Sequence, residues 1–170
     1  DPDVIDIYLT LYRVASESHI VNELIRAPKN GKNVFAFIEL KARFDEENNI
    51  RWSKLMKEAG VKIIYSQPDI KVHSKIALVK KKSGDKHLSY ALLSTGNFNE
   101  ITAQFYTDHV LMTTDKTIIK ELEPLLEFLR KNDAEAKAKI KFEKLLVSQF
   151  NMFERFEKLI NAEIKKAQAG

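Results

Sequence analysis

The chain has 170 residues, 44% of them hydrophobic and 31% charged, and this balance predicts one globular domain with a continuous core. It contains no cysteine, and no apolar stretch approaches the roughly 18 residues that cross a bilayer, so a disulfide framework, a thiol nucleophile and a membrane-spanning helix are excluded. The formal net charge of +4 favours a polyanionic partner without naming one.

Strands and helices alternate through the first 66 residues. Three segments rich in β-branched and aromatic side chains are predicted strands: 4–14, 33–40 and 61–66. Two segments with a helical pattern lie between them: 16–30 and 45–60. Ser16 is a candidate N-cap of the first helix. This alternation predicts an α/β fold with a parallel or mixed sheet and helices on its faces.

Beyond Pro68 the pattern changes. A hairpin of two strands around the turn KSGD is predicted first, followed by a third strand and a helix: 72–82, 88–95, 107–114 and 116–131. The tail is predicted to be mostly helical, with a charged solvated segment, a short strand and an amphipathic helix: 133–144, 145–148 and 150–168. We expect residues 1–170 to form a single domain. Since the chain begins at Asp1 without methionine, we expect it to be part of a longer protein.

A histidine and a lysine two residues apart, His73 and Lys75, stand at the start of one predicted strand. Alternation along the strand places both side chains on the same face. One interpretation makes the imidazole a nucleophile for phosphorus and the ammonium a clamp for phosphoryl oxygens. Taken alone, the two residues favour a plainer alternative, in which they are polar side chains at the wet end of a strand.

Two further features favour an anion site at the same edge. The stretch 94–108 suits a tight turn that presents amides to an anion, or else an ordinary turn in which Asn99 caps a helical segment. Asp108 then enters the next strand, where a carboxylate could hold a histidine tautomer. Arg13 and Arg43 each lie near the C-terminal end of a predicted strand, where open α/β sheets bind ligands. Together with His-x-Lys, these arginines predict a phosphate site.

Long stretches of the sequence resemble the bacterial polyphosphate kinase family of the histidine-phosphorylating type. The matching motifs, in order, are TLYRV, ELKARFDEENNIRW, KVHSKIALV, and STGNFNE followed by FYTDH. The similarity continues to the C-terminal LLVSQFNM and INAEIKKAQAG, so it covers essentially the whole chain. It implies a phospholipase D-like mixed β-sheet flanked by helices on both faces. The chain resembles the first of two such C-terminal domains in a longer enzyme.

The resemblance implies a catalytic group. His73 falls where the family has its phosphorylated histidine, and Lys75 and Asn97 match the lysine and asparagine around the phosphoryl group. The implied reaction transfers the terminal phosphate of ATP through a phosphohistidine to inorganic polyphosphate, and it is reversible. Asp108 as partner of an active-site histidine is an inference from the residues.

The resemblance also implies a nucleotide and a cation. Tyr106 falls where a tyrosine contacts the ATP nucleotide, and Arg13 and Arg43 match two arginines of the magnesium–phosphate assembly. An arginine has only donors, so these two would hold phosphate oxygens that magnesium bridges and would not bind the metal directly. The implied partners are ATP or ADP, polyphosphate and the remaining domains of the parent enzyme, a cytoplasmic homo-oligomer that can associate with membranes.

Some residues depart from related families. The general phospholipase D motif has an aspartate five positions after its lysine, where this chain has Lys80. Such sites also use two histidines. Of the three others here, His19 and His87 are expected to be structural or solvated, and His109 neighbours Asp108 but alternates to the opposite face of its strand. We therefore expect the second histidine to come from another domain and the isolated chain to be nearly inactive. Phe153 stands where the family usually has arginine, so no polyphosphate contact is assigned to it.

Two other functions are compatible with the residues. One is a phosphodiesterase or nuclease in which two chains pair and each contributes one His73, although Lys80 in place of the aspartate argues against it. The other is a non-enzymatic polyanion-binding module, whose salt-sensitive binding would not depend on His73.

Overall fold

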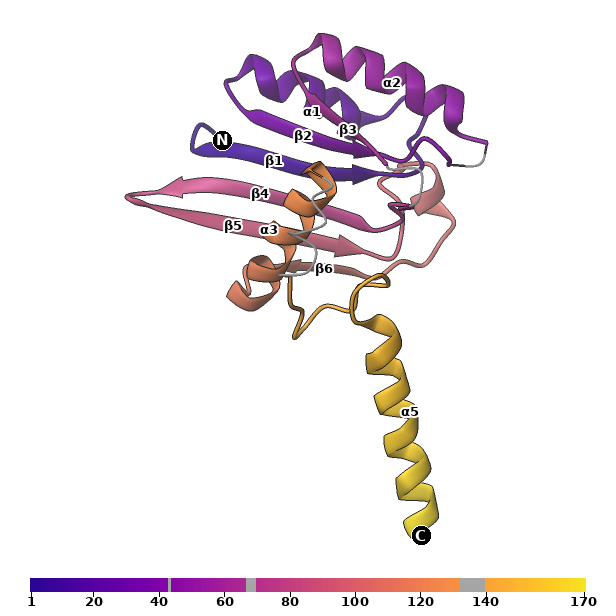
Figure 1. The fold of residues 1–170 in the computed structure, drawn as a ribbon. Coiled ribbons are helices and arrows are strands. Elements are labelled where there is room, and N and C mark those ends of the chain that lie inside the picture. Colours follow the sequence, from indigo (N-terminus) through magenta and orange to yellow (C-terminus); the bar gives the residue numbers. More distant parts are fainter. Residues whose placement is uncertain (43, 67–69, 132–139) are drawn as a thin grey trace.

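The computed structural model describes residues 1–42, 44–66, 70–131 and 140–170. Six strands form one mixed sheet in the order β3-β2-β1-β4-β5-β6 (Figure 1). Their bounds are Val4–Leu11 for β1, Asn33–Ile38 for β2, Lys62–Tyr65 for β3, Lys75–Ser83 for β4, Lys86–Ser94 for β5 and Val110–Thr113 for β6. Strands β1, β2 and β3 are parallel to one another, whereas β4 pairs antiparallel with both β1 and β5, and β5 pairs antiparallel with β6.

Helices cover both faces of this sheet (Figure 1). The two on one face are α1, His19–Lys29, and α2, Glu46–Glu58, and the one on the other is α3, Lys116–Lys131. Alternation along β2 divides the core, because Ala36 and Ile38 pack with α1 and α2 while Phe37 packs with α3. The predicted α/β class, with a mixed sheet between layers of helices, is confirmed.

Helix α1 begins later than predicted. Its N-cap is Ser18 and not Ser16, and the Ser18 hydroxyl accepts a hydrogen bond from the Val21 amide at 3.3 Å. A carboxylate from a distant loop strengthens this start, since Glu100 accepts hydrogen bonds from the Ser18 hydroxyl and the Ile20 amide at 3.0 and 3.1 Å. Because Glu100 is distant in the chain, this contact could not be predicted from the residues around Ser18.

The segment before the last helix differs most from the prediction. Residues 145–148 form a loop and not a strand, and residues 140–144 are not helical. The buried Glu121 carboxylate accepts hydrogen bonds from three consecutive amides, those of Glu143, Lys144 and Leu145, at 2.7, 3.0 and 2.8 Å. Because these amides bind Glu121, they do not form the hydrogen bonds of a β-sheet or a helix. Ile140 and Phe142 pack on the α3 side of the core, whereas Lys141, Glu143 and Lys144 are exposed. The solvated interpretation of 133–144 therefore holds for the described charged residues and is wrong for the two apolar ones.

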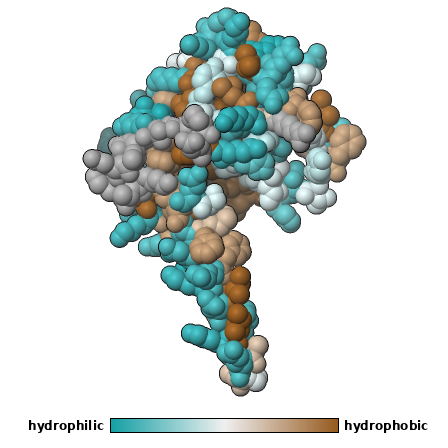
Figure 2. Space-filling model, turned by 45° about the vertical axis from the view of Figure 1, so that its right-hand side comes forward, coloured by the Kyte–Doolittle hydropathy of each residue, from teal (hydrophilic) through white to brown (hydrophobic). Residues whose placement is uncertain are grey.

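The last helix, α5, spans Met152–Ala169 and extends away from the sheet (Figure 1). Its amphipathic pattern confirms the sequence prediction, and a hydrophobic stripe runs along it (Figure 2). The exposed apolar side chains of this stripe are Phe153, Phe156, Leu159, Ile160 and Ile164. Within the described ranges, neither α5 nor any other helix is long and apolar enough to cross a membrane. The interpretation of residues 1–170 as one domain stays a prediction.

Because the Glu121 carboxylate binds three consecutive amides, two similar substitutions on α3 should lower the free energy of unfolding by different amounts. Glu121→Gln should lower the free energy of unfolding by about 2 kcal/mol, because a neutral amide cannot accept from all three buried amides. Glu123→Gln removes only a partly exposed ion pair with Lys80 and should cost less than about 0.5 kcal/mol. Urea unfolding of the two variants measures the difference, and equal costs would contradict the anchoring role.

Candidate functional site

The sheet topology brings the ends of five chain segments to one edge. Strands β1 and β2 end there, and β4 begins there because it runs antiparallel to β1. Lys75, the first residue of β4, pairs with Ser94, the last residue of β5, and Ser94 also pairs with Val110 at the start of β6. Residues that follow β1, β2 and β5, or that precede β4 and β6, therefore meet at this edge. All seven predicted site residues belong to these segments, although Arg43 lies outside the residues that the structure describes.

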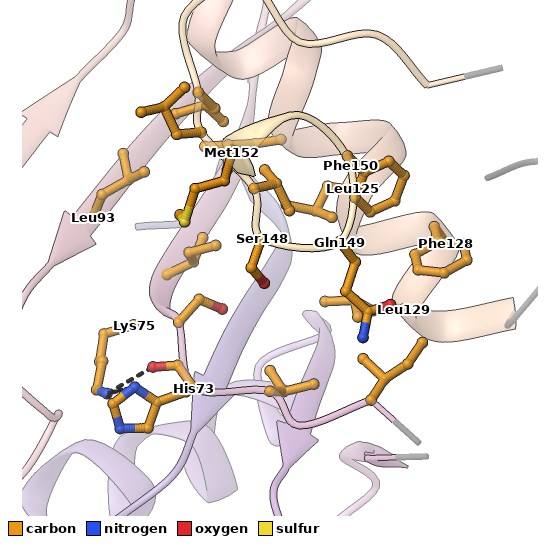
Figure 3. A pocket seen from close by; sticks show the side chains of 18 of the residues that line it. His73, Lys75, Leu93, Leu125, Phe128, Leu129, Ser148, Gln149, Phe150 and Met152 are labelled. Carbon is orange, nitrogen blue, oxygen red and sulfur yellow. Dashed lines mark hydrogen bonds between the residues drawn. The ribbon is translucent and has the colours of Figure 1, made fainter. Parts of the chain in front are cut away.

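His73 and Lys75 are in direct contact. The Lys75 Nζ lies 3.1 Å from Nε2 and 3.3 Å from Nδ1 of His73, and it donates a hydrogen bond to the His73 carbonyl at 2.6 Å (Figure 3). Lys75 is buried, whereas His73 precedes the strand and is exposed. The predicted proximity is confirmed, but it arises because the lysine folds back toward a residue outside the strand.

This contact requires a neutral imidazole, since an ammonium group repels an imidazolium. Partial burial of the ring lowers the pKa of His73, and the charges of Lys75, Lys71 and Arg13 lower it further. Burial also lowers the pKa of Lys75, as does Arg13, while Asp108 acts in the opposite direction. Burial and the surrounding cationic groups therefore both favour the unprotonated form of this histidine.

Tyr12 supports the His73 ring from the β1 side. The two rings meet edge to face with centroids 4.5 Å apart. The Lys75 and Lys71 ammonium groups lie 5.2 and 5.4 Å from the centroid of the same Tyr12 ring. Sequence reasoning missed Tyr12, although it lies directly beside Arg13 and is the only aromatic residue of the motif TLYRV.

Side chains of α2 hold the loop that carries Arg13. Three of them donate hydrogen bonds to backbone carbonyl groups of this loop: Asn49 to Tyr12 at 2.9 Å, Asn48 to Val14 at 2.8 Å and Trp52 to Ala15 at 2.9 Å. Arg13 itself donates from Nε to the Asp45 carboxylate at 2.6 Å. That hydrogen bond raises the pKa of Arg13 above its ordinary value. The guanidinium is thus held at this edge of the sheet. Among the described residues only Asp45 engages it, so its other donors are available to a ligand.

Asp108 packs against a glycine. A Cβ at Gly96 would lie 1.9 Å from the Asp108 Oδ2 atom, so any larger residue at 96 requires the carboxylate to move. The carboxylate accepts a hydrogen bond from the Thr95 hydroxyl at 3.3 Å and lies close enough to raise the pKa of Lys75. The role of Asp108 toward a histidine stays a prediction, because its described contacts are with Thr95 and Lys75.

The remaining predicted residues lie around the same loop. Asn97 directly follows Gly96, and among the described residues its Oδ1 atom is buried without a hydrogen-bond partner. Asn99 accepts hydrogen bonds from the Ile101 and Thr102 amides at 3.1 and 3.0 Å, in a turn that leads into the short 3₁₀ helix Thr102–Gln104, whose N-cap is Ile101 and not Asn99. Tyr106 is 69% exposed, and its hydroxyl affects the pKa of Arg13, so both flank the opening of the site.

A pocket of about 330 Å³ adjoins the histidine. His73 and Lys75 lie at one end and Leu125 and Phe128 of α3 at the other, with Ser148 between them (Figure 3). Because the far end is apolar, phosphate groups fit only the end near His73. Over the part of the chain that the structure describes, no group of three or more histidine, cysteine or carboxylate side chains could hold a metal ion. The groups present suit phosphate oxygens and not a directly bound cation.

Lys80 points away from this site. Its ammonium group pairs with Glu123 at 3.0 Å and lies 5.7 Å from the Tyr8 ring centroid. Both partners belong to the α3 side of the sheet, several residues along β4 from Lys75. The lysine that replaces the phospholipase D aspartate therefore stabilises the packing of α3 and takes no part in the candidate site.

Comparisons with known proteins agree with the motifs. A family model described as polyphosphate kinase C-terminal domain 1 matches residues 1–135. Curated polyphosphate kinases of Vibrio parahaemolyticus and Escherichia coli are 43% and 41% identical to the whole chain, each over 24% of its own length. The crystal structure of polyphosphate kinase from Porphyromonas gingivalis matches with a TM-score of 0.82 and 45% identity, over 100% of this chain and 28% of that one. This chain thus spans about a quarter of the length of the curated relatives it matches.

The packing of Gly96 on Asp108 predicts a measurable change in Lys75. Gly96→Ala should displace the Asp108 carboxylate, and because that negative charge raises the pKa of Lys75, the pKa should fall. Asp108→Asn, which removes the charge without a clash, should lower it in the same direction. NMR titration of the lysine side chain tests both variants, and an unchanged pKa in either would show that Asp108 does not act on Lys75.

Proposed function

Since this chain belongs to the polyphosphate kinase family, with residues 1–135 matching C-terminal domain 1, we propose that it carries the phosphoryl-transfer site of a polyphosphate kinase. The proposed reaction moves the terminal phosphate of ATP to His73 and then, reversibly, to inorganic polyphosphate. The observation that carries the proposal is the contact of His73 with the buried Lys75 ammonium at 3.1 Å. This contact supports a neutral imidazole as the nucleophile, with a cation beside it, in a phospholipase D-like α/β domain.

In the first step an imidazole nitrogen attacks the γ-phosphorus. A nitrogen–phosphorus bond forms as the bond to the bridging oxygen breaks, and the electron pair leaves with ADP. The histidine must be unprotonated, and the cations around it favour that state. Lys75 can turn from the ring nitrogen to a phosphoryl oxygen as the new bond forms, because its three donors rotate freely.

Stabilisation of charge is the main contribution of the other residues. A loose transition state spreads negative charge over the equatorial oxygens, where Lys75 and the free donors of Arg13 would bind. Magnesium bound with the nucleotide would neutralise phosphate charge, and this chain would reach it through phosphate oxygens held by Arg13 and Arg43. Asn97 is proposed to bind the phosphoryl group, Tyr106 the nucleotide, and Asp108 to orient a histidine.

Residues outside this chain complete the proposed site. We assign the second histidine and part of the nucleotide contacts to the other domains of the parent enzyme, because this chain spans 24% of its relatives' length. The family resemblance supports a homo-oligomeric parent enzyme in the cytoplasm that can associate with membranes. The isolated chain should bind phosphate and be nearly inactive.

The nucleophile is tested by labelling the complete parent enzyme with γ-labelled ATP and magnesium. The enzyme should acquire acid-labile, base-stable label, and His73→Ala should abolish it, because no other nitrogen occupies that position. His87→Ala is the matched control: this exposed histidine pairs with Lys82 at the far end of the hairpin and should leave labelling unchanged.

Other outcomes would point to the alternatives. Label retained by His73→Ala would exclude His73 as the nucleophile. Salt-sensitive polyphosphate binding that is also indifferent to His73 would then support the polyanion-binding module. Hydrolysis of a phosphodiester by a dimer of this chain would support the phosphodiesterase, against which the Lys80–Glu123 pair argues.

The pKa of His73 predicts the pH dependence of labelling. Labelling should rise with pH, and the midpoint of the rise should lie below the ordinary histidine pKa of about 6.5, because the folded site favours the neutral ring. Lys71→Met removes one of the charges that lower this pKa, so the rise should move to higher pH. Lys86→Met, at the hairpin turn, should leave the profile in place. A profile that stays unmoved, or moves to lower pH, in Lys71→Met would contradict the electrostatic account.

A further inference from the structure

Strand β4 separates from β1 just before the site. The last paired residues of the two strands are Leu9 and Ala77. Strand β1 continues its pairing with β2 to Leu11, and β4 continues its pairing with β5 back to Lys75. The residues ahead of β4 therefore turn out of the sheet, and this departure is what brings His73 to the surface.

Beyond Leu9 and Ala77, the side chain of Thr10 replaces the backbone hydrogen bonds that β1 and β4 no longer make with each other. Thr10 is 1% exposed, and its hydroxyl accepts a hydrogen bond from the Ile76 amide at 2.9 Å and donates one to the Ser74 carbonyl at 2.7 Å. Both backbone groups lie on the edge of β4 that faces β1. One hydroxyl thus satisfies a donor and an acceptor that would otherwise be unpaired where the strands part.

A buried carboxylate holds the other side of the same segment. Glu39, also 1% exposed, accepts a hydrogen bond from the Val72 amide at 2.9 Å, directly before the histidine. Its second oxygen accepts from the Lys41 amide and the Ser66 hydroxyl, each at 2.8 Å. Glu39 therefore joins the ends of β2 and β3 to the segment that carries His73.

We propose that Thr10 and Glu39 are positioning residues that hold residues 72–76 so that His73 meets Lys75 and Tyr12. Neither side chain reaches the surface where a phosphate would bind, so both act through His73. The expected effect of Thr10 and Glu39 on catalysis rests on the proposed function. Their effect on the position of His73 can be measured without any reaction. Buried polar groups that only filled the core would be replaceable by apolar groups of equal shape.

The charged surroundings of His73 make its position observable. Lys71 and Lys75 belong to its own segment, Arg13 reaches it from the loop after β1, and Asp108 acts on Lys75 from the segment before β6. The net cationic field at the ring falls if loss of these anchors lets the His73 side chain turn away from the Lys75 ammonium, Tyr12 and Arg13. A released His73 should therefore titrate closer to its ordinary pKa of about 6.5 than the held one does.

Two substitutions at one position provide the test. Thr10→Val keeps the shape but removes the hydroxyl, whereas Thr10→Ser keeps the hydroxyl. By NMR of the chain, Thr10→Val should raise the pKa of His73 by about half a unit or more, and Thr10→Ser should leave it near the original value. In the complete parent enzyme, Thr10→Val should slow labelling by about tenfold or more, and Thr10→Ser should restore it.

Glu39→Gln is the second test and decides the matter if Thr10→Val does not fold. The amide keeps the size of the side chain but cannot accept at both ends, so the Val72 anchor or the Lys41 and Ser66 anchors are lost. It should shift the pKa of His73 in the same direction as Thr10→Val.

The proposal is overturned if neither Glu39→Gln nor Thr10→Val moves the pKa, or if Thr10→Val and Thr10→Ser behave alike. Failure of His73 as the nucleophile would instead appear as label retained in His73→Ala, with the NMR result unaffected.

Discussion

Strand β4 runs antiparallel to β1, so its first residue lies beside the end of β1 and not at the opposite edge of the sheet. A continued parallel order would have placed His73 and Lys75 on the far side from Arg13. Because β5 and β6 also pair antiparallel, the loops around Asn97 and Asp108 come to the same edge. One reversal of strand direction thus assembles residues that are up to 95 positions apart in the chain.

The assembled site has an excess of positive charge that nothing in the described chain fully balances. Asp45 pairs with Arg13, and Asp108 acts on Lys75, but His73 and Lys75 still have pKa values below their ordinary ones. An incoming phosphate would relieve this repulsion, because its charge favours the protonated lysine. Cationic groups held together in this way disfavour one another's charged forms, and perturbed pKa values of this kind are typical of functional sites.

The alternation of strands and helices, the hairpin and the α/β class could be predicted from the sequence, because apolar alternation and turn residues are local signals. The order of the strands within the sheet was not predicted. The helix start at Ser18 could not, since Glu100 reaches it from more than 80 residues away. The loop at 145–148 was mistaken for a strand because the amides that Glu121 binds leave no trace in composition. For the site, His73 and Lys75 were found through their spacing. Thr10 and Glu39 were not found, because a threonine and a glutamate in predicted strands carry no distinguishing pattern.

The contact between Gly96 and Asp108 also limits how this loop can vary. Alanine at 96 has no room while an aspartate carboxylate occupies the space beside its Cα, but a shorter residue at 108 would free that space. The effect of a substitution at either position thus depends on the residue at the other, so the two are epistatic. A chain that lost the carboxylate would no longer need the glycine, whereas a change that began at position 96 would have to displace the carboxylate.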